Sequence, residues 1–134
     1  QVLIFTNEAR AEARKCGQFG SFRAVPPVFP NELLRCAARR HSLDMVDRSF
    51  FDHRDPDGVG PDKRARDAGY PWRAVGENIA AGSATPRKVV DGWLNSPGHC
   101  KNIMSPDFDE LGVGYTPKSA GRFTHYWTQV FGKR

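Results

Sequence analysis

The chain has 134 residues, of which 39% are hydrophobic and 26% are charged, and its formal net charge is +5. This length fits one domain, residues 1–134, and the composition is not the apolar-poor, highly charged one of a disordered chain. The charge permits attraction to nucleic acid, anionic lipid or acidic polymers, but the basic residues are scattered and no nucleic-acid-binding motif occurs. No stretch approaches the roughly 20 apolar residues of a membrane span. We therefore expect no nucleic-acid partner and no membrane span.

The N-terminal half has the apolar spacing of helices. In residues 2–15 apolar side chains recur every three or four positions and Gly17 follows, which predicts a helix with a glycine after its C-terminus. The segment AVPPVFP, residues 24–30, is predicted to be an extended linker. Asn31 is a good cap for a second helix that runs towards Phe50. The buried stripe expected on this second helix consists of Leu34, Ala37, Ala38, His41 and Met45.

The middle of the chain alternates loops with short helices. DHRDPDGVGP, residues 52–61, is dense in Asp, Pro and Gly and predicts a loop, and a short helix is expected in residues 62–69. Residues 74–82 form a short apolar run interrupted by a Glu-Asn pair. Thr85 and Pro86 then have the chemistry of a helix cap and first turn, for a helix that must stop near Pro97.

The last third of the chain changes to a period of two. In ELGVGYT, residues 110–116, and RFTHYWTQVFG, residues 122–132, large side chains alternate with small or polar ones, which is typical of strands. The intervening PKSAG is expected to be a hairpin loop. Helices followed by an antiparallel hairpin indicate a layered α+β domain.

Three cysteines allow at most one disulfide within the chain. Cys36 is expected to be a small buried thiol, because alanines follow it on the second predicted helix. Cys16 and Cys100 lie at ends of predicted elements beside glycines, so we expect these two to pair. The alternative is three free thiols in a reducing compartment.

Five short motifs follow one another along the chain: HSLDM at 41–45, GENIA at 76–80, GWLNSPGHCKNIM at 92–104, LGVGY at 111–115 and YWTQVFG at 126–132. Together they resemble the CAP superfamily, which groups cysteine-rich secretory proteins, antigen 5, pathogenesis-related 1 and bacterial SCP-like extracellular proteins. The resemblance spans nearly the whole chain, and the bacterial branch is the most similar one. It implies a three-layer α-β-α sandwich with a small antiparallel sheet, secreted to the extracellular space or periplasm.

The resemblance also implies a cleft that carries two histidines and two acids. In this sequence His41, Glu77 and His99 fall on three of these four positions. The fourth position, three residues after Trp93, is Ser96 instead of an acid. A serine hydroxyl is a weaker ligand than a carboxylate and no general base at neutral pH, so the departure puts into doubt any activity that needs the complete tetrad.

Two imidazoles and a carboxylate are a familiar ligand set for zinc and other divalent metals. His41, His99 and Glu77 are therefore the candidate ligands of a divalent metal. Ser96 and Pro97 have the chemistry of a helix start, so His99 would lie in the positive end of a helix dipole, which favours the neutral imidazole that binds metal. Taken alone, His41 would be a hydrogen-bonded core histidine, and Glu77 a buried carboxylate that holds loop amides.

His53, in FFDHRDPDG, is a further candidate for a secondary role in the cleft, or else a loop histidine bound to a neighbouring Asp.

The sequence is compatible with three functions of the chain. The favoured one is a secreted, monomeric binding module for a lipid, glycan or protein partner, because Ser96 replaces an acid. The alternative is a metal-dependent, peptidase-like hydrolase with His41 and His99 as ligands and Glu77 as ligand or general base. The third is a purely structural polar network.

Overall fold

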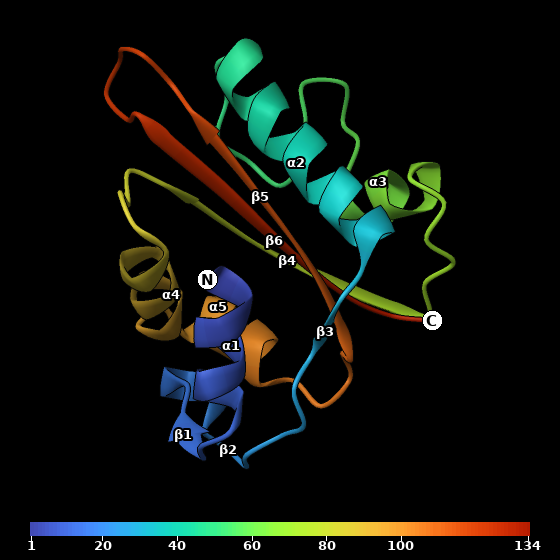
Figure 1. Cartoon of the computed structure of the whole chain (residues 1–134), viewed down its shortest axis with the longest axis vertical. Coiled ribbons are helices and arrows are strands. Elements are labelled where there is room, and N and C mark those ends of the chain that lie inside the picture. The colour runs from blue at the N-terminus through green and yellow to red at the C-terminus, as the bar shows by residue number, and fades with distance from the viewer.

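The structure is a computed structural model that describes residues 1–134 (Figure 1). Its elements follow one another in the order α1 Val2–Arg10, β1 Arg14–Lys15, the 3-10 helix η1 Gly17–Phe19, β2 Ser21–Phe22, β3 Phe29–Pro30, α2 Glu32–Asp47, α3 Pro61–Asp67, β4 Ala74–Ala81, α4 Pro86–Leu94, α5 Pro97–Met104, β5 Glu110–Pro117 and β6 His125–Lys133. None of the helices combines the length and the apolar character needed to cross a membrane.

A four-stranded sheet with the order β3-β5-β6-β4 forms the middle of the molecule. β5 and β6 make the expected antiparallel hairpin, and β3 adds to β5 in parallel through two residues. β4 pairs with the other side of β6 along its whole length, from Ala74 opposite Lys133 to Ala81 opposite Tyr126. The apolar run around the Glu-Asn pair is therefore an edge strand. β1 and β2 form a separate two-stranded ribbon.

Helices cover both faces of this sheet, which confirms the expected three-layer α-β-α sandwich. α2 and α3 lie on one face, and α1, α4 and α5 lie on the other (Figure 1). α2 packs so closely on β5 that a Cβ atom added to Gly114 would collide with the main chain of Ala38. The Ser42 hydroxyl also lies 2.7 Å from the Thr128 hydroxyl of β6. α2 is thus held directly against the sheet.

The core has a large part between the sheet and the α1-α4-α5 layer and smaller parts under α2. Every residue of the stripe expected on α2 is buried, His41 included. Asn31 caps this helix as expected, since its side chain accepts from the amides of Leu33 and Leu34. The Cys16–Cys100 disulfide joins the start of η1 to α5, which confirms the expected pairing.

Two local expectations were wrong. The first helix ends at Arg10, and Arg14 and Lys15 belong to β1. The buried Arg10 side chain donates to main-chain carbonyls, among them those of Pro26 and Ile103, and so ties the helix end to α5. Cys36 is exposed instead of buried, because it lies outside the buried stripe of α2.

Side chains from the α4-α5 layer cover the outer edge of β4. Trp93 Nε1 donates to the carbonyl oxygen of Ile79 over 3.0 Å, and Asn102 Nδ2 donates to the carbonyl oxygen of Glu77 over 3.2 Å. α4 and α5 are therefore joined to the strand that carries Glu77.

Candidate functional site

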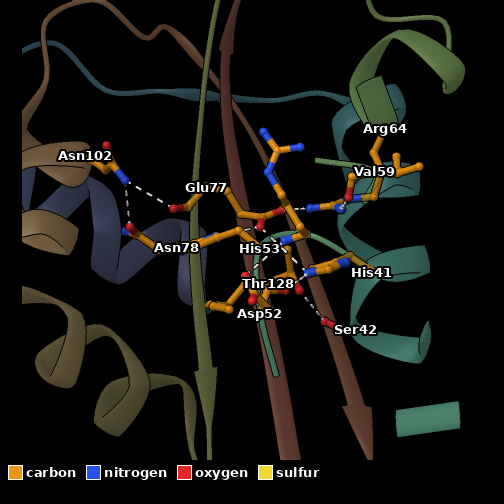
Figure 2. A network of polar contacts seen from close by, with 12 residues as sticks. His41, Ser42, Asp52, His53, Val59, Arg64, Glu77, Asn78, Asn102 and Thr128 are labelled. Atoms are coloured by element: carbon orange, nitrogen blue, oxygen red, sulfur yellow. Dashed lines mark hydrogen bonds and ion pairs between the residues drawn. The ribbon is translucent and has the colours of Figure 1, made fainter. Parts of the chain in front are cut away.

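Glu77 is the centre of a polar network on the α2 side of β4 (Figure 2). Its side chain is only 1% exposed, and both of its oxygens have partners. Oε1 accepts from His53 Nδ1 over 2.9 Å, and Oε2 accepts from Arg64 Nη2 over 2.7 Å. A buried carboxylate is stable when it is both paired and hydrogen-bonded, and Glu77 is both.

Arg64 brings α3 into the site. Its side chain is 11% exposed, and its Nη1 donates to the carbonyl oxygen of Val59 over 2.9 Å. The guanidinium therefore links the negative charge of Glu77 to the loop that precedes α3. Nothing in the spacing of the sequence identifies Arg64 among the 20 basic residues, so the sequence prediction missed it.

His53 is the imidazole that contacts Glu77 most closely, and its side chain is 45% exposed. Because an ionised carboxylate accepts, Nδ1 carries the proton and Nε2 has the free lone pair of the neutral ring. The loop that carries His53 is well held. Asp55 accepts from the amides of Asp57 and Val59, and Arg48, at the end of α2, donates to Asp57 over 2.8 Å.

His41 is completely buried and has a different task. Its Nε2 donates to the carbonyl oxygen of Asp52 over 2.8 Å and lies 3.8 Å from Glu77 Oε1. Burial lowers the pKa of His41, although the Glu77 charge raises it in part. A neutral His41 therefore anchors the loop residue next to His53. This agrees with the hydrogen-bonded core histidine that its position on an apolar helix face indicates.

His99 reaches the same strand from the opposite layer, in the first turn of α5. Asn78 Nδ2 donates to the His99 carbonyl oxygen, and Asn102 Nδ2 donates to Asn78 Oδ1. The disulfide at Cys100 fixes the next residue. Burial lowers the pKa of the half-buried His99 imidazole, and the nearby His53 lowers it further. His53 and His99 thus approach from the two sides of the β4 edge.

Ser96 precedes α5 as its N-cap residue, but its side chain makes no capping hydrogen bond. It supplies no charge to the Glu77 network.

The expected grouping of His41, Glu77, Ser96 and His99 is changed in one respect. The partly exposed histidine hydrogen-bonded to Glu77 is His53, expected only in a secondary role, while His41 lies behind it. We call His53, Glu77, Arg64 and His99 the histidine–glutamate site.

The expected metal ligands do not fit a cation. No group of three or more His, Cys, Asp or Glu side chains is placed to hold a metal ion. Glu77 also has Arg64 on one oxygen and His53 on the other, so a divalent cation bound there would face a guanidinium at short range. The Nε2 of His41 is already used by the Asp52 carbonyl. His41, Glu77 and His99 therefore do not form a ligand set in this structure.

Several proteins from bacteria are similar to this chain. YkwD of Bacillus subtilis is 39% identical over 131 residues, which cover 98% of this chain and 45% of YkwD. The chain thus spans less than half of that relative. An extracellular SCP-domain protein from Bacillus anthracis matches with a TM-score of 0.74 and 32% identity, over 82% of this chain and 35% of that chain.

More distant structures share the fold alone. An outer surface protein of Borrelia burgdorferi has a TM-score of 0.74 at 22% identity, with 82% of this chain and 80% of that chain covered.

The model of the cysteine-rich secretory protein family, CAP, matches residues 3–131, nearly the whole chain. The layered fold and the motifs around Glu77 and His99 agree with this match. This chain belongs to the cysteine-rich secretory protein family, CAP.

Proposed function

We propose that this chain is an extracellular binding module and that the histidine–glutamate site binds a polar group of a lipid, glycan or protein ligand. The observation that carries the proposal is that both carboxylate oxygens of Glu77 already have hydrogen-bond partners. Because Arg64 and His53 already occupy both carboxylate oxygens, Glu77 acts as a fixed group that orients His53. The partly exposed imidazoles of His53 and His99 remain available to a ligand.

The two imidazole rings are suited to hydrogen bonding. A neutral ring presents one donor and one acceptor nitrogen, and His53 uses Nδ1 on Glu77, which leaves its Nε2 for a ligand. The lowered pKa of His99 keeps that ring neutral near pH 7. Hydroxyl and amide groups, which both donate and accept, complement such a pair. The disulfide between Cys16 and Cys100 supports an oxidising, extracellular location.

The proposal is tested by binding to three probes in turn: a soluble peptidoglycan fragment, phosphatidylglycerol vesicles and an extracellular protein extract fractionated by size. His53→Ala and His99→Ala should each weaken binding of the true ligand by about tenfold, the loss of one or two hydrogen bonds. His125→Ala is the matched control, because His125 is a partly exposed histidine on β6 that bonds to Tyr115 instead. Equal losses in all three variants would contradict the proposal.

A hydrolase is the second candidate, and the 2.9 Å contact between His53 Nδ1 and Glu77 Oε1 favours it. A carboxylate that orients a histidine leaves Nε2 free to take a proton from a water, whose hydroxide then adds to an ester or amide carbonyl. The tetrahedral intermediate then expels the alcohol or amine, which receives that proton back from Nε2 as the C–O or C–N bond breaks. This form of the hydrolase needs no metal. Turnover that survives chelation and falls by about 100-fold or more in His53→Asn would support it. Turnover that requires added metal and survives His53→Asn would contradict it.

A further inference from the structure

The outer edge of β5, which faces away from β6, is only partly covered. β3 pairs with this edge through two residues, and the chain then leaves the sheet to form α2 (Figure 1). The main-chain amide of Asn31 donates to the carbonyl oxygen of Leu111, so the main-chain groups of Leu111 point to the outer edge. Because successive residues of a strand direct these groups to opposite sides, those of Val113 and Tyr115 point outward as well. No strand of the sheet pairs with them, and the edge stays open up to Pro117, which has no amide hydrogen.

A groove of about 390 Å³ lies at the beginning of this open edge. Residues 111–113 of β5 form part of its lining, together with residues 1–3 at the start of α1 and with Glu32 and Arg35 at the start of α2. The volume is in the range of binding sites in proteins. Further along β5, Tyr115 is 40% exposed. The open edge is therefore accessible to a partner both in the groove and beyond it.

The α1 side of the groove is apolar. Leu3 and Val113 line it there, and both are partly buried hydrophobic residues that pack against the large core cluster. Pro86, at the start of α4, and the buried Trp127 also belong to the lining. Side chains of a strand point alternately to the two faces of its sheet. Every second side chain of a strand added at this edge would therefore meet an apolar surface.

The α2 side of the edge is basic. A Cβ atom added to Gly112 would meet the main-chain nitrogen of Arg35, and one added to Gly114 would meet that of the next arginine. This next arginine is Arg39, so the two arginines follow β5 about one helical turn apart. Both are exposed. The ion-pair partner of Arg35 is the exposed Glu32 at 3.6 Å, and Arg39 has none. The other side chains of an added strand would therefore meet positive charge.

Charge favours a different chain over a second copy of this one. Two copies of β5 paired edge to edge would bring the Arg35 and Arg39 side chains of both copies together, and like charges at a shared interface cost free energy. The positions of β5 beside these arginines are Gly112 and Gly114, so a second copy brings no acid to them. A segment with acidic side chains at these alternate positions neutralises the arginines instead.

We propose that the open edge of β5 is a docking site for an extended peptide segment of a partner protein, in which apolar and acidic side chains alternate. The segment adds a strand to the sheet in the line that β3 begins, and its main chain pairs with the amides and carbonyls of Val113 and Tyr115. Its apolar side chains enter the groove beside Leu3, and its acidic side chains lie beside Arg35 and Arg39. The proposal does not rest on the function of the histidine–glutamate site, none of whose residues lines the groove.

The test is amide hydrogen exchange of the isotope-labelled chain, followed by NMR, with and without a capped heptapeptide of alternating valine and aspartate. In the free chain the amides of Val113 and Tyr115 should exchange much faster than that of Gly114, which pairs with β6. The peptide at saturation should slow the exchange of Val113 and Tyr115 by about tenfold or more. The same peptide with a methyl group on every backbone nitrogen cannot donate to the edge and should give no protection.

The charge match is tested by titration of the same peptide at low salt. Arg39→Glu should weaken its binding by about fivefold or more, because an attraction becomes a repulsion. Arg23→Glu is the matched control, since Arg23 is also an exposed arginine but lies outside the groove lining, and it should leave the affinity unchanged. A peptide with lysine in place of aspartate should not bind.

Each contrary result overturns the proposal in its own way. No binding at millimolar peptide would show that the edge does not accept a strand. Equal protection by the methylated peptide would exclude main-chain pairing, and equal losses in Arg39→Glu and Arg23→Glu would exclude the charge match. Slow exchange of Val113 and Tyr115 that grows with the concentration of the free chain, with a dimer in sedimentation, would assign the edge to a second copy.

Discussion

Replacing Glu77 by glutamine is the sharpest test of how the site is held together. Glutamine keeps the shape of the side chain but removes the charge that Arg64 pairs with. Arg64 is only 11% exposed, and its other bond goes to the neutral Val59 carbonyl over 2.9 Å. Breaking a buried ion pair by removing one partner costs about 3–5 kcal/mol, because the other charge stays buried and unpaired. That is a large part of the roughly 5–15 kcal/mol that stabilises a domain.

The free energy of unfolding is measured by urea denaturation at pH 7 without reductant, so that the disulfide stays closed. The double variant Glu77→Gln/Arg64→Met removes both charges and should be more stable than the sum of the two single losses predicts, by at least about 1 kcal/mol. Asp67→Asn is the control, since it breaks the exposed ion pair with Lys63 and should cost less than about 1 kcal/mol. A loss below about 1 kcal/mol in Glu77→Gln, or strict additivity in the double variant, would refute a tightly coupled buried pair.

Three further predictions concern stability. The Cys16–Cys100 disulfide joins residues 84 positions apart, so replacing both cysteines by serine should lower the free energy of unfolding by about 4.5 kcal/mol, measured by denaturation, and a negligible loss would contradict this. The pKa of His41 in the folded state lies below its unfolded value of 6.5, so the unfolded state binds a proton more readily. The contribution of His41 to the free energy of unfolding should therefore be fully present above pH 6.5 and fall below it by up to about 1.4 kcal/mol per pH unit. His41→Gln should give a flatter profile of unfolding free energy against pH. Gly114→Ala should cost about 1–3 kcal/mol in the same assay, because its methyl group would meet Ala38, and an unchanged midpoint would show that α2 can shift.

The fold could be predicted for those elements whose sequence pattern shows directly which of their faces is buried. The stripe of α2 and the alternation of β5 and β6 reflect which face is buried, so both were visible in the sequence. β4 was missed as a strand because its central Glu77 and Asn78 are polar on both faces of the sheet. Each is satisfied by a partner distant in sequence, namely Arg64 for Glu77 and Gln129 for Asn78. Such partners leave no local signal.

The place of the site in the fold could be predicted from the sequence, but not all of the residues that interact there. The motifs pointed to Glu77 and His99, which the structure places along one strand edge. His41 and His53 come from α2 and from the loop after it, and both contact the same carboxylate oxygen. The stripe of α2 predicted that His41 is buried, whereas the position of His53 beside Glu77 depends on the fold of that loop. The ion pair with Arg64 also requires the position of α3, and it removes the free carboxylate that the expected metal site needed.

The covered edge of β4 has a consequence for how the molecule behaves at high concentration. An open strand edge offers unpaired carbonyls to a strand of another chain, which is a route to aggregation. Here the Trp93 indole and the Asn102 amide occupy the outward carbonyls of Ile79 and Glu77. The strand that carries the histidine–glutamate site is thereby prevented from recruiting a second copy of itself, and ligands meet side chains there instead of bare backbone.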